Sequence, residues 1–470
     1  MHKPPGFPTE LPASLVVDPA RVRQLNDRPL RSGDYVLYWM QQSQRAADNH
    51  ALTYGIEAAN LCRLPLLVVF GLTMHYPEAN RRHFSFMLEG LRETSTRLAQ
   101  QGIRLAMVHG HPPEVALKAG RKAALVICDR GYLRHQKQWR TAVAGEAQCP
   151  VVEIESDAVV PVDVASAKAE YAARTIRPKI KRLLPAFLKP LKTVRLQRPS
   201  LELPLRGMAM NEIDALLQSL PMQTDVPPAG RFYRGGAGEA MARLRRFIEQ
   251  TLPRYAASHN QPQTDDVSHM SPYLHFGQIS PLRIALEISQ TQSTPELQAS
   301  VDAYLEQLLI RRELAINFVH HTPDYDSYSC IPDWARQTLD AHRTDRREHL
   351  YGRDALESAG THDAYWNAAM MEMRITGFMH TYMRMYWGKK ILEWSPSPEQ
   401  AFETLLALNN RYFIDGRDPN SYAGAAWIFG THDRPWKERP IFGKVRYMAA
   451  SGLERKCDIA AYVNLRAIPQ

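Results

Sequence analysis

The chain has 470 residues, of which 44% are hydrophobic and 23% charged, a composition typical of a soluble globular protein that excludes general disorder. It is too long for one core, and at roughly 100 to 200 residues per domain we expect two large units. No apolar run of about 18 residues and no secretory signal occurs, so we expect a cytoplasmic protein, or a nuclear or organellar one in a eukaryote, with no membrane partner.

The charge balance favours a polyanionic partner, because 58 Lys and Arg against 49 Asp and Glu give a net charge of +9. Residues 174–198 hold nine basic side chains and no acidic one. The cysteines are five in number and scattered, which predicts reduced thiols. His320 adjoins His321, but no motif with metal-ligand spacing accompanies them, so we expect no metal site.

The first half of the chain predicts a doubly wound parallel sheet. Helical patterns, such as residues 80–101, alternate with short apolar runs that read as strands at 35–39, 65–70, 104–110, 123–129 and 151–155. We expect a Rossmann-like α/β domain over residues 31–165, preceded by an N-terminal extension over 1–30. Neither a dinucleotide nor a triphosphate fingerprint is present, although a ligand could still lie at the carboxyl edge of the sheet.

The second half predicts an all-α domain. Segments rich in Pro and Arg suggest an interdomain connection over residues 166–236, and helical periodicity dominates the expected domain over 237–470. Residues 301–318 predict one amphipathic helix. Residues 364–392 predict one or two helices, with Gly377 and Gly388 as candidate breaks.

Two segments of the helical half carry candidate chemistry. Ser268 and Ser271 precede Pro272 and a helical continuation, an arrangement that suits a phosphate group. Six of the eight tryptophans fall between residues 334 and 436, interleaved with arginines and Asn/Asp-rich turns. A basic, tryptophan-rich region suggests electron transfer, nucleic-acid contact or both.

These segments together resemble the photolyase/cryptochrome flavoproteins, and most closely the class II cyclobutane pyrimidine dimer photolyases. The resemblance covers both expected domains and rests on VLYWMQQSQRAADNHAL at 36–52, MSPYLHFGQIS at 270–280, RRELAINFV at 311–319, YWNAAMMEMRITGFMHTYMRMYWGKKILEWS at 365–395, DGRDPNSYAG at 415–424 and HDRPWKERPIFGKVRYM at 432–448.

The resemblance implies a U-shaped FAD in the helical domain, active as the reduced anion, and leaves room for a deazaflavin or folate antenna in the N-terminal domain. It implies catalytic roles for Arg384 paired with Asp415 near the isoalloxazine and for Asn409 facing its N5. The residues that it places around the cofactor are Tyr255, Ser268, Met270, Ser271, Arg312, Arg384, Asn409, Asp415 and Asp418.

The implied reaction is a light-driven carbon–carbon lyase reaction, in which an electron from reduced flavin opens a thymine dimer flipped out of DNA. Trp427 and Trp436 would stack on the dimer, Met385 would pack beside it, and Gln307 would contact it. Class II relatives commonly carry an acidic residue where this chain has Gln307, so repair efficiency is expected to be reduced or retuned.

The resemblance also implies an electron relay that reduces oxidised flavin from the surface inwards, through Trp394, Trp366 and Trp387 in turn. We expect a monomeric repair enzyme. A cryptochrome-like light sensor without repair activity is the alternative, and a redox flavoprotein with incidental DNA affinity is the third option.

Overall fold

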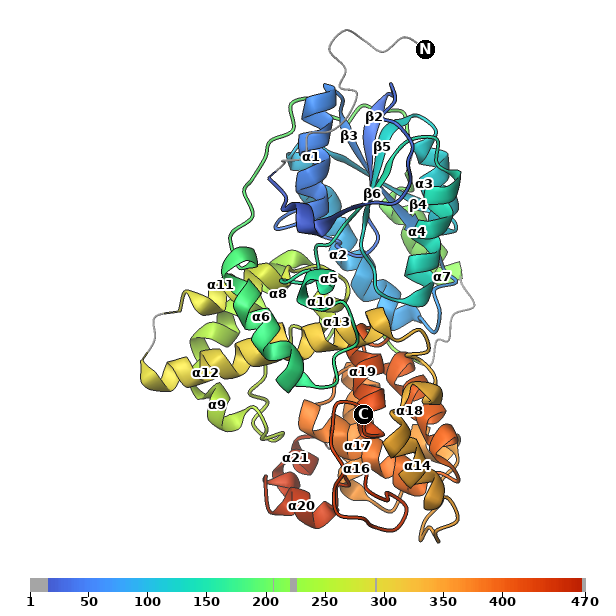
Figure 1. The fold of residues 1–470 in the computed structure, drawn as a ribbon, viewed down its shortest axis with the longest axis vertical. Coiled ribbons are helices and arrows are strands. Elements are labelled where there is room, and N and C mark those ends of the chain that lie inside the picture. The colour runs from blue at the N-terminus through green and yellow to red at the C-terminus, as the bar shows by residue number, and fades with distance from the viewer. Residues whose placement is uncertain (1–15, 206, 220–225, 292–293, 467–470) are drawn as a thin grey trace.

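The computed structural model describes residues 16–205, 207–219, 226–291 and 294–466. A six-stranded sheet with its covering helices forms one end of the molecule, and a larger body of helices forms the other (Figure 1). The strand order is β1-β6-β5-β2-β3-β4, and all pairs are parallel except β1 with β6. The strands are β1 (Val22–Gln24), β2 (Tyr35–Trp39), β3 (Leu66–Leu72), β4 (Arg104–His109), β5 (Ala123–Asp129) and β6 (Val151–Ile154).

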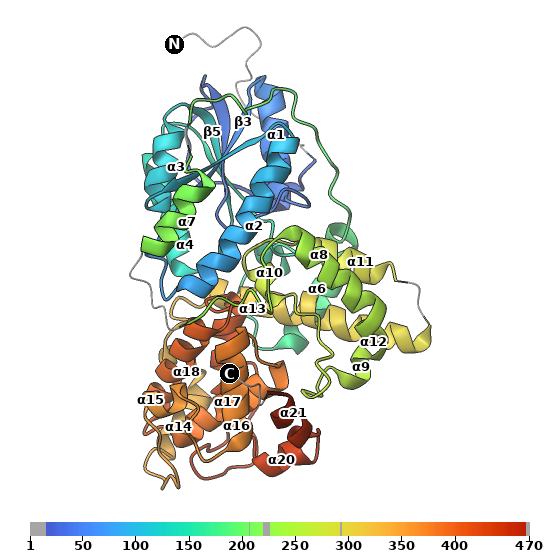
Figure 2. The ribbon, with the colours of Figure 1, turned by 180° about the vertical axis from the view of Figure 1, so that it is seen from behind.

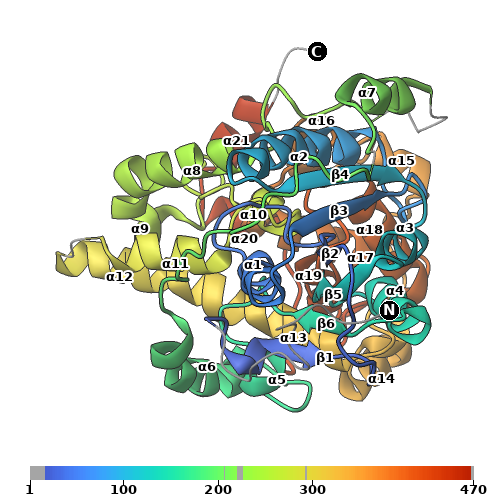
Figure 3. The same cartoon turned by 90° about the horizontal axis from the view of Figure 1, so that it is seen from above.

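Helices cover both faces of the sheet, as Figure 3 shows from above. Helices α1 (His50–Cys62) and α2 (Arg81–Gln100) pack on the face that receives Val36 and Tyr38. Helices α3 (Pro112–Gly120) and α4 (Arg134–Glu146) pack on the face that receives Leu37 and Trp39. A sheet buried on both faces needs strands that are apolar throughout, which is why β2, β3 and β5 read as continuous hydrophobic runs.

The predicted α/β fold class with a doubly wound parallel sheet and a helical second part is confirmed, and the five predicted strands are all present. No sequence pattern predicted β1, an antiparallel edge strand inside the expected N-terminal extension. Residues 1–15 of that expected extension lie outside the described residues.

Helices α5 (Val162–Ala165), α6 (Ala173–Phe187) and α7 (Met210–Ser219) belong to the segment between the sheet and the main helical body. Helix α6 carries the first part of the basic run and lies against the helical body, whereas α7 returns to the sheet beside α2 (Figure 2). The expected connection over residues 166–236 therefore contacts both parts of the molecule.

The helical body begins at α8 (Ala237–Arg246). Its other α-helices are α9 (Tyr255–Ser258), α10 (Ser271–His275), α11 (Pro281–Ser289), α12 (Pro295–Leu305), α13 (Arg312–His321), α14 (Asp333–Ala341), α15 (Arg353–Glu357), α16 (Ala364–Thr376), α17 (Thr381–Trp394), α18 (Pro398–Tyr412), α19 (Pro419–Ile428), α20 (Ala450–Glu454) and α21 (Ile459–Arg466). Short 3-10 or π-helical turns are η1 (Pro19–Arg21), η2 (Phe247–Thr251), η3 (Leu252–Arg254), η4 (Glu306–Arg311) and η5 (Tyr328–Cys330). Within the described residues, no helix is both long and apolar enough to cross a membrane.

Two helix predictions need correction. The expected single helix over 301–318 is interrupted by the π-helical turn η4 between α12 and α13. Gly377 does end α16, with φ 76°, but Gly388 lies inside α17 and breaks nothing. A Cβ at Gly388 would lie 2.8 Å from Ile428 and 2.9 Å from Leu405, so this glycine allows neighbouring helices to approach closely.

The first turn of α2 joins the sheet to the helical body. Arg82 is fully buried and donates hydrogen bonds to the carbonyl oxygens of Pro227 at 2.9 Å, Met373 at 3.1 Å and Tyr412 at 2.6 Å. The adjacent His83 Nε2 lies 2.9 Å from the Phe413 carbonyl oxygen. Because these carbonyls lie on elements that surround the candidate site, α2 fixes that site relative to the sheet.

Candidate cofactor and nucleic-acid site

The segment that the sequence marks for phosphate binding lies at and before the start of α10. Tyr255 is buried in α9 beside Tyr304, and the Tyr304 hydroxyl donates to Ser268 Oγ at 3.2 Å. Met270 is buried and directly precedes α10, whose first residue is Ser271. No side-chain hydrogen bond caps this helix start, so its backbone N–H groups remain able to bind an anion.

Arg384 and Asp415 form an ion pair between α17 and the turn that precedes α19. Arg384 Nη2 lies 3.1 and 3.2 Å from the two carboxylate oxygens, and its Nε donates to the Met379 carbonyl oxygen at 3.1 Å. The guanidinium carbon also lies 3.8 Å from the centre of the Phe413 ring. The ion pair gives a partner to a carboxylate that is only 8% exposed, and burial of an unpaired charge would be costly.

Asn409 lies in the last turns of α18. It is buried, and its Nδ2 donates to Asn410 Oδ1 at 3.0 Å. Asn410 in turn receives the backbone N–H of Arg417 at 3.0 Å. This bonding fixes the amide of Asn409 on a rigid helix rather than on a mobile turn.

The remaining two predicted cofactor residues lie next to the sheet. Arg312 Nη1 donates to the Asp157 carbonyl oxygen at 2.6 Å, which ties α13 to the segment after β6. Asp418 caps the start of α19 through the Asn420 N–H and lies 3.3 Å from His275 Nδ1. Burial, the largest single cause, would raise the pKa of Asp418, but the hydrogen bond with His275, the attraction to Arg312 and the Asn420 N–H together hold that pKa below its ordinary value.

The three predicted relay tryptophans form one contact series. The Trp366 ring stacks on Trp387 with centroids 6.4 Å apart and planes 12° apart, and it meets Trp394 edge-on at 5.7 Å. Trp366 Nε1 donates to the Trp387 carbonyl oxygen at 3.0 Å. Trp387 lies 6.3 Å from Phe413, the ring that Arg384 covers. The series therefore leads to the Arg384–Asp415 pair.

Trp394 is the outer member of this series, but it is only 2% exposed. Tyr351 and His362 meet its ring edge-on at 5.4 and 5.2 Å, and Lys390 Nζ lies 5.6 Å from its centre. The sequence predicts a relay that starts at the surface, whereas these side chains cover the indole.

The four predicted substrate residues lie on separate elements. Gln307 is exposed on η4, and Met385 is partly buried on α17. Trp427 is partly buried near the end of α19, and Trp436 is 42% exposed in the loop that follows. The guanidinium carbons of Arg434 and Arg446 lie 5.5 and 5.0 Å from the Trp436 ring centre.

An indole flanked by two arginines has an apolar face and a positive rim, which suits a base next to a phosphate. The sequence predicted the tryptophan but not its two cationic neighbours.

A pocket lies at the carboxyl ends of β2, β3 and β5, where this sheet meets the helical body. Its lining includes Trp39, Gln42, Tyr76, Asp129, Trp139 and Arg417. Crevices outside the carboxyl ends of parallel strands are the usual ligand sites of doubly wound sheets. The pocket therefore lies where the sequence left room for a second ligand.

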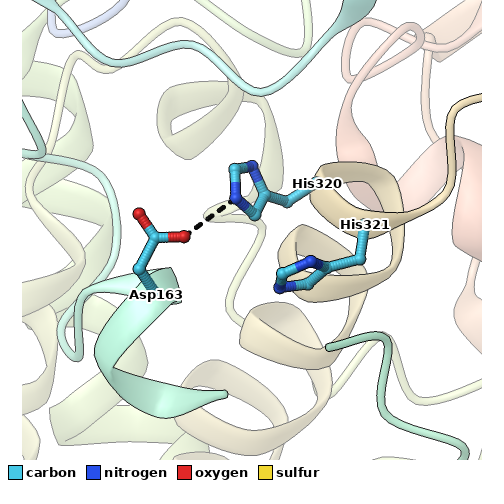
Figure 4. Close-up of side chains that lie close together, drawn as sticks. All are labelled: Asp163, His320 and His321. Atoms are coloured by element: carbon cyan, nitrogen blue, oxygen red, sulfur yellow. Dashed lines mark hydrogen bonds and ion pairs between the residues drawn. The ribbon is translucent and has the colours of Figure 1, made fainter. Parts of the chain in front are cut away.

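Asp163, His320 and His321 gather between α5 and α13 (Figure 4). His320 Nε2 lies 3.0 Å from Asp163 Oδ1, and the Arg130 guanidinium donates to the other oxygen of the same carboxylate at 2.7 Å. Arg130 also lies 3.4 Å from His320 Nε2, so a metal ion would meet a fixed positive charge. We interpret the cluster as an ion-pair network, and the absence of a functional metal stays a prediction.

Comparison with known proteins identifies this arrangement. The family model described as DNA photolyase matches residues 36–197. The deoxyribodipyrimidine photo-lyase of Methanothermobacter thermautotrophicus is 48% identical over 94% of this chain and 97% of its own length. That of Oryza sativa subsp. japonica is 39% identical over 95% of this chain and 90% of its own. The chain belongs to the DNA photolyase family.

A solved structure supports the fold independently. The class III photolyase of Agrobacterium tumefaciens superposes with a TM-score of 0.71 over 93% of this chain and 86% of that one, at 17% identity. The predicted photolyase/cryptochrome membership is confirmed, and with it flavin-type chemistry. The finer assignment to class II stays a prediction.

Proposed function

We propose that this protein is a deoxyribodipyrimidine photo-lyase (EC 4.1.99.3), which uses light to split cyclobutane pyrimidine dimers in DNA. Chain-wide similarity to photo-lyases from an archaeon and a plant carries the proposal. The site agrees with it in two ways. The buried tryptophan series leads to the Arg384–Asp415 ion pair, and the exposed Trp436 lies between two arginines. A light sensor without repair would not need that exposed, cation-flanked indole.

The residues of the helical body fit FAD. The uncapped start of α10 and Ser268 could hold the phosphates, while Arg384, Asp415 and Asn409 could surround the flavin ring. Trp387 Nε1 is buried without a hydrogen-bond partner, and an orphaned buried donor is consistent with a bound group that would supply an acceptor. Reduced FAD, when bound, would supply the photoexcited electron, so the protein needs no acid, base or nucleophile of its own.

The protein side chains would position the substrate and exclude water. A pyrimidine dimer pairs and stacks poorly in a duplex, which lowers the cost of flipping it out. Trp427 and Trp436 would receive its faces, Met385 would pack against it, and Gln307 would donate to or accept from its edges. The ion pair of Arg384 with Asp415 would keep a fixed charge pattern at the flavin.

The pocket at the carboxyl ends of the strands would hold the antenna chromophore. Trp39 and Trp139 offer flat apolar surfaces, and Gln42 and Asp129 offer polar contacts, which together suit a deazaflavin or folate ring system. We further propose a class II enzyme that acts as a cytoplasmic monomer.

Irradiation of the reduced protein with dimer-containing oligonucleotide tests this function. Near-ultraviolet or blue light should restore intact thymines, while a dark sample should not, and chromatography of the oligonucleotide measures both. A protein that binds flavin and responds to light but leaves the dimer intact would support the light-sensor alternative. A protein that takes up no flavin would contradict both.

A further inference from the structure

The π-helical turn η4 presents a second polar side chain beside the predicted substrate residue Gln307. Arg311 follows Gln307 by four residues, which places both on about the same face of a helical segment. Arg311 is partly exposed, with 34% of its side chain accessible. Turns of π-helix are rare and are frequent at functional sites, so this irregular turn itself points to a role.

Arg311 covers the indole that the dimer is proposed to stack on. Its guanidinium carbon lies 5.5 Å from the ring centre of Trp427. Trp427 belongs to α19, and α19 packs along α13, the helix that directly follows η4 in the chain. A base that stacks beside Trp427 would therefore lie close to this guanidinium.

Ion pairs hold Arg311 in this place. Its Nε lies 3.4 Å from Glu306 Oε1, and Arg177 of α6 donates to both oxygens of Glu306 at 3.0 and 2.6 Å. Burial, the largest single cause, would raise the pKa of Glu306, but the hydrogen bond with Arg177 and the charges of Arg177, Arg311 and Lys181 together lower that pKa. Glu306 is thus an ionised carboxylate that orients the Arg311 guanidinium through its ion pair.

We propose that Arg311 contacts the flipped pyrimidine pair directly and is a determinant of lesion selectivity, an inference that rests on the repair function proposed above. A flipped dimer exposes carbonyl oxygens that have lost their base-pairing partners, and a planar guanidinium is well suited to donate to such acceptors. Trp427 holds the face of the dimer, while Arg311 and Gln307 bind its edge. Glu306 and Arg177 are positioning residues that act through Arg311.

A phosphate contact would be a different role for the same charge, and binding data separate the two. A phosphate contact weakens damaged and undamaged DNA alike and lowers the salt dependence of binding by about one counterion. A contact with the dimer weakens only damaged DNA and leaves the salt dependence unchanged. The distinction needs two oligonucleotides of identical sequence, one with a dimer and one without.

The experiment measures affinities of the flavin-loaded full chain for both oligonucleotides at several salt concentrations. For Arg311→Gln we expect roughly tenfold weaker binding of the dimer, the value of one bidentate contact, with undamaged DNA unaffected. Arg311→Lys keeps the charge without the planar fork and should recover only part of this loss. Glu306→Gln keeps Arg311 but loosens it, so we expect a smaller loss.

Arg92→Gln is the matched control, because it removes an α2 arginine of similar exposure whose ion-pair partner is Asp214 of α7. It should change neither affinity. Flavin content and thermal unfolding show whether each variant is folded. Equal weakening of both DNAs by Arg311→Gln, or no weakening of either, would overturn the inference while repair by the unaltered protein stands. If the unaltered protein shows no preference for the dimer, the proposed function fails as well.

Discussion

At the scale of single residues, burial separates the two groups of tryptophan. Trp366, Trp387 and Trp394 are at most 2% exposed and touch one another, whereas Trp436 is 42% exposed. A buried indole in contact with other indoles can pass charge but cannot reach DNA. An exposed indole between arginines can stack on a base but is not part of the contact series.

Trp366→Phe should strongly slow the photoreduction of oxidised flavin and should spare repair once the flavin is reduced chemically. The change removes the central indole of the series and its hydrogen bond to Trp387, at a cost of no more than about 2 kcal/mol in stability. Flavin absorbance under illumination measures the first effect, and a dimer repair assay the second. Trp334→Phe, on α14, is the control and should change neither. Equal loss of both activities would assign Trp366 a structural role only.

Glu372 should make stability depend on pH. It is 1% exposed, and burial raises its pKa to about 7, although Arg466 opposes the shift. Because the folded pKa lies above the unfolded value of 4.5, the contribution to the free energy of unfolding is complete below pH 4.5 and is lost as pH rises to about 7.

Urea unfolding of the unaltered protein and of Glu372→Gln, at intervals from pH 5 to pH 8, measures this effect. The variant stays neutral and keeps a partner for Tyr462, so the unaltered protein should lose up to about 3 kcal/mol relative to it as pH rises. A constant difference between the two proteins would contradict the buried carboxyl as the cause.

At the scale of elements, local geometry fixes where the helices around the site begin and end. Gly377 ends α16 in the left-handed conformation, and its backbone carbonyl oxygen accepts the Ile414 N–H at 3.0 Å, just before Asp415. The end of α16 is thereby tied to the turn that carries the ion-pair carboxylate. A change at this glycine should affect both stability and the cofactor site.

Gly377→Ala should destabilise the protein by at least about 1 kcal/mol and lower its flavin content. The φ of 76° disfavours a side chain, and a Cβ would lie 2.5 Å from Ile414 Cγ1. Gly424→Ala is the matched control, since this glycine lies inside α19 with no neighbour within 4 Å of its Cβ, and it should stabilise by about 1 kcal/mol. Thermal unfolding and bound flavin absorbance check both, and similar shifts in the two variants would refute the argument.

At the scale of the whole molecule, the sheet and the helical body are joined by buried polar contacts rather than by a flexible hinge. Arg82 binds carbonyls from Pro227, Met373 and Tyr412 at once. Hydrogen bonds from a charged donor to buried acceptors are costly to lose, so this side chain couples the two parts.

Arg82→Met should cost at least about 3 kcal/mol and separate the unfolding of the two parts. Tryptophan fluorescence reports mainly on the helical body, which holds six of the eight tryptophans, while circular dichroism reports on both parts. The two signals should coincide during urea unfolding of the unaltered protein and diverge for the variant. Arg81→Met, at the exposed neighbouring position, should leave them coincident. Coincident and unshifted transitions in Arg82→Met would rule out this coupling role.

The sequence predicted those elements whose signal is local. The apolar runs of the parallel strands and the left-handed break at Gly377 depend on a few adjacent residues, so the sequence could predict them. Strand β1 has only three residues and no buried pattern, and it exists because β6 offers a free edge. Gly388 resembles a helix break in the sequence. In the structure its lack of a side chain instead allows α17 to pack closely against Ile428 and Leu405.

By itself, the sequence determined the fold class, because hydrophobic periodicity is written along the chain, and its motifs resembled one family closely enough to indicate membership and to predict the site residues. Only the tertiary structure decided which of those side chains meet. Arg311 and Trp427 lie on different helices, and Glu306 reaches Arg311 together with a partner from α6. Contacts of this kind form when separate helices pack and share buried charges, and no local pattern encodes them.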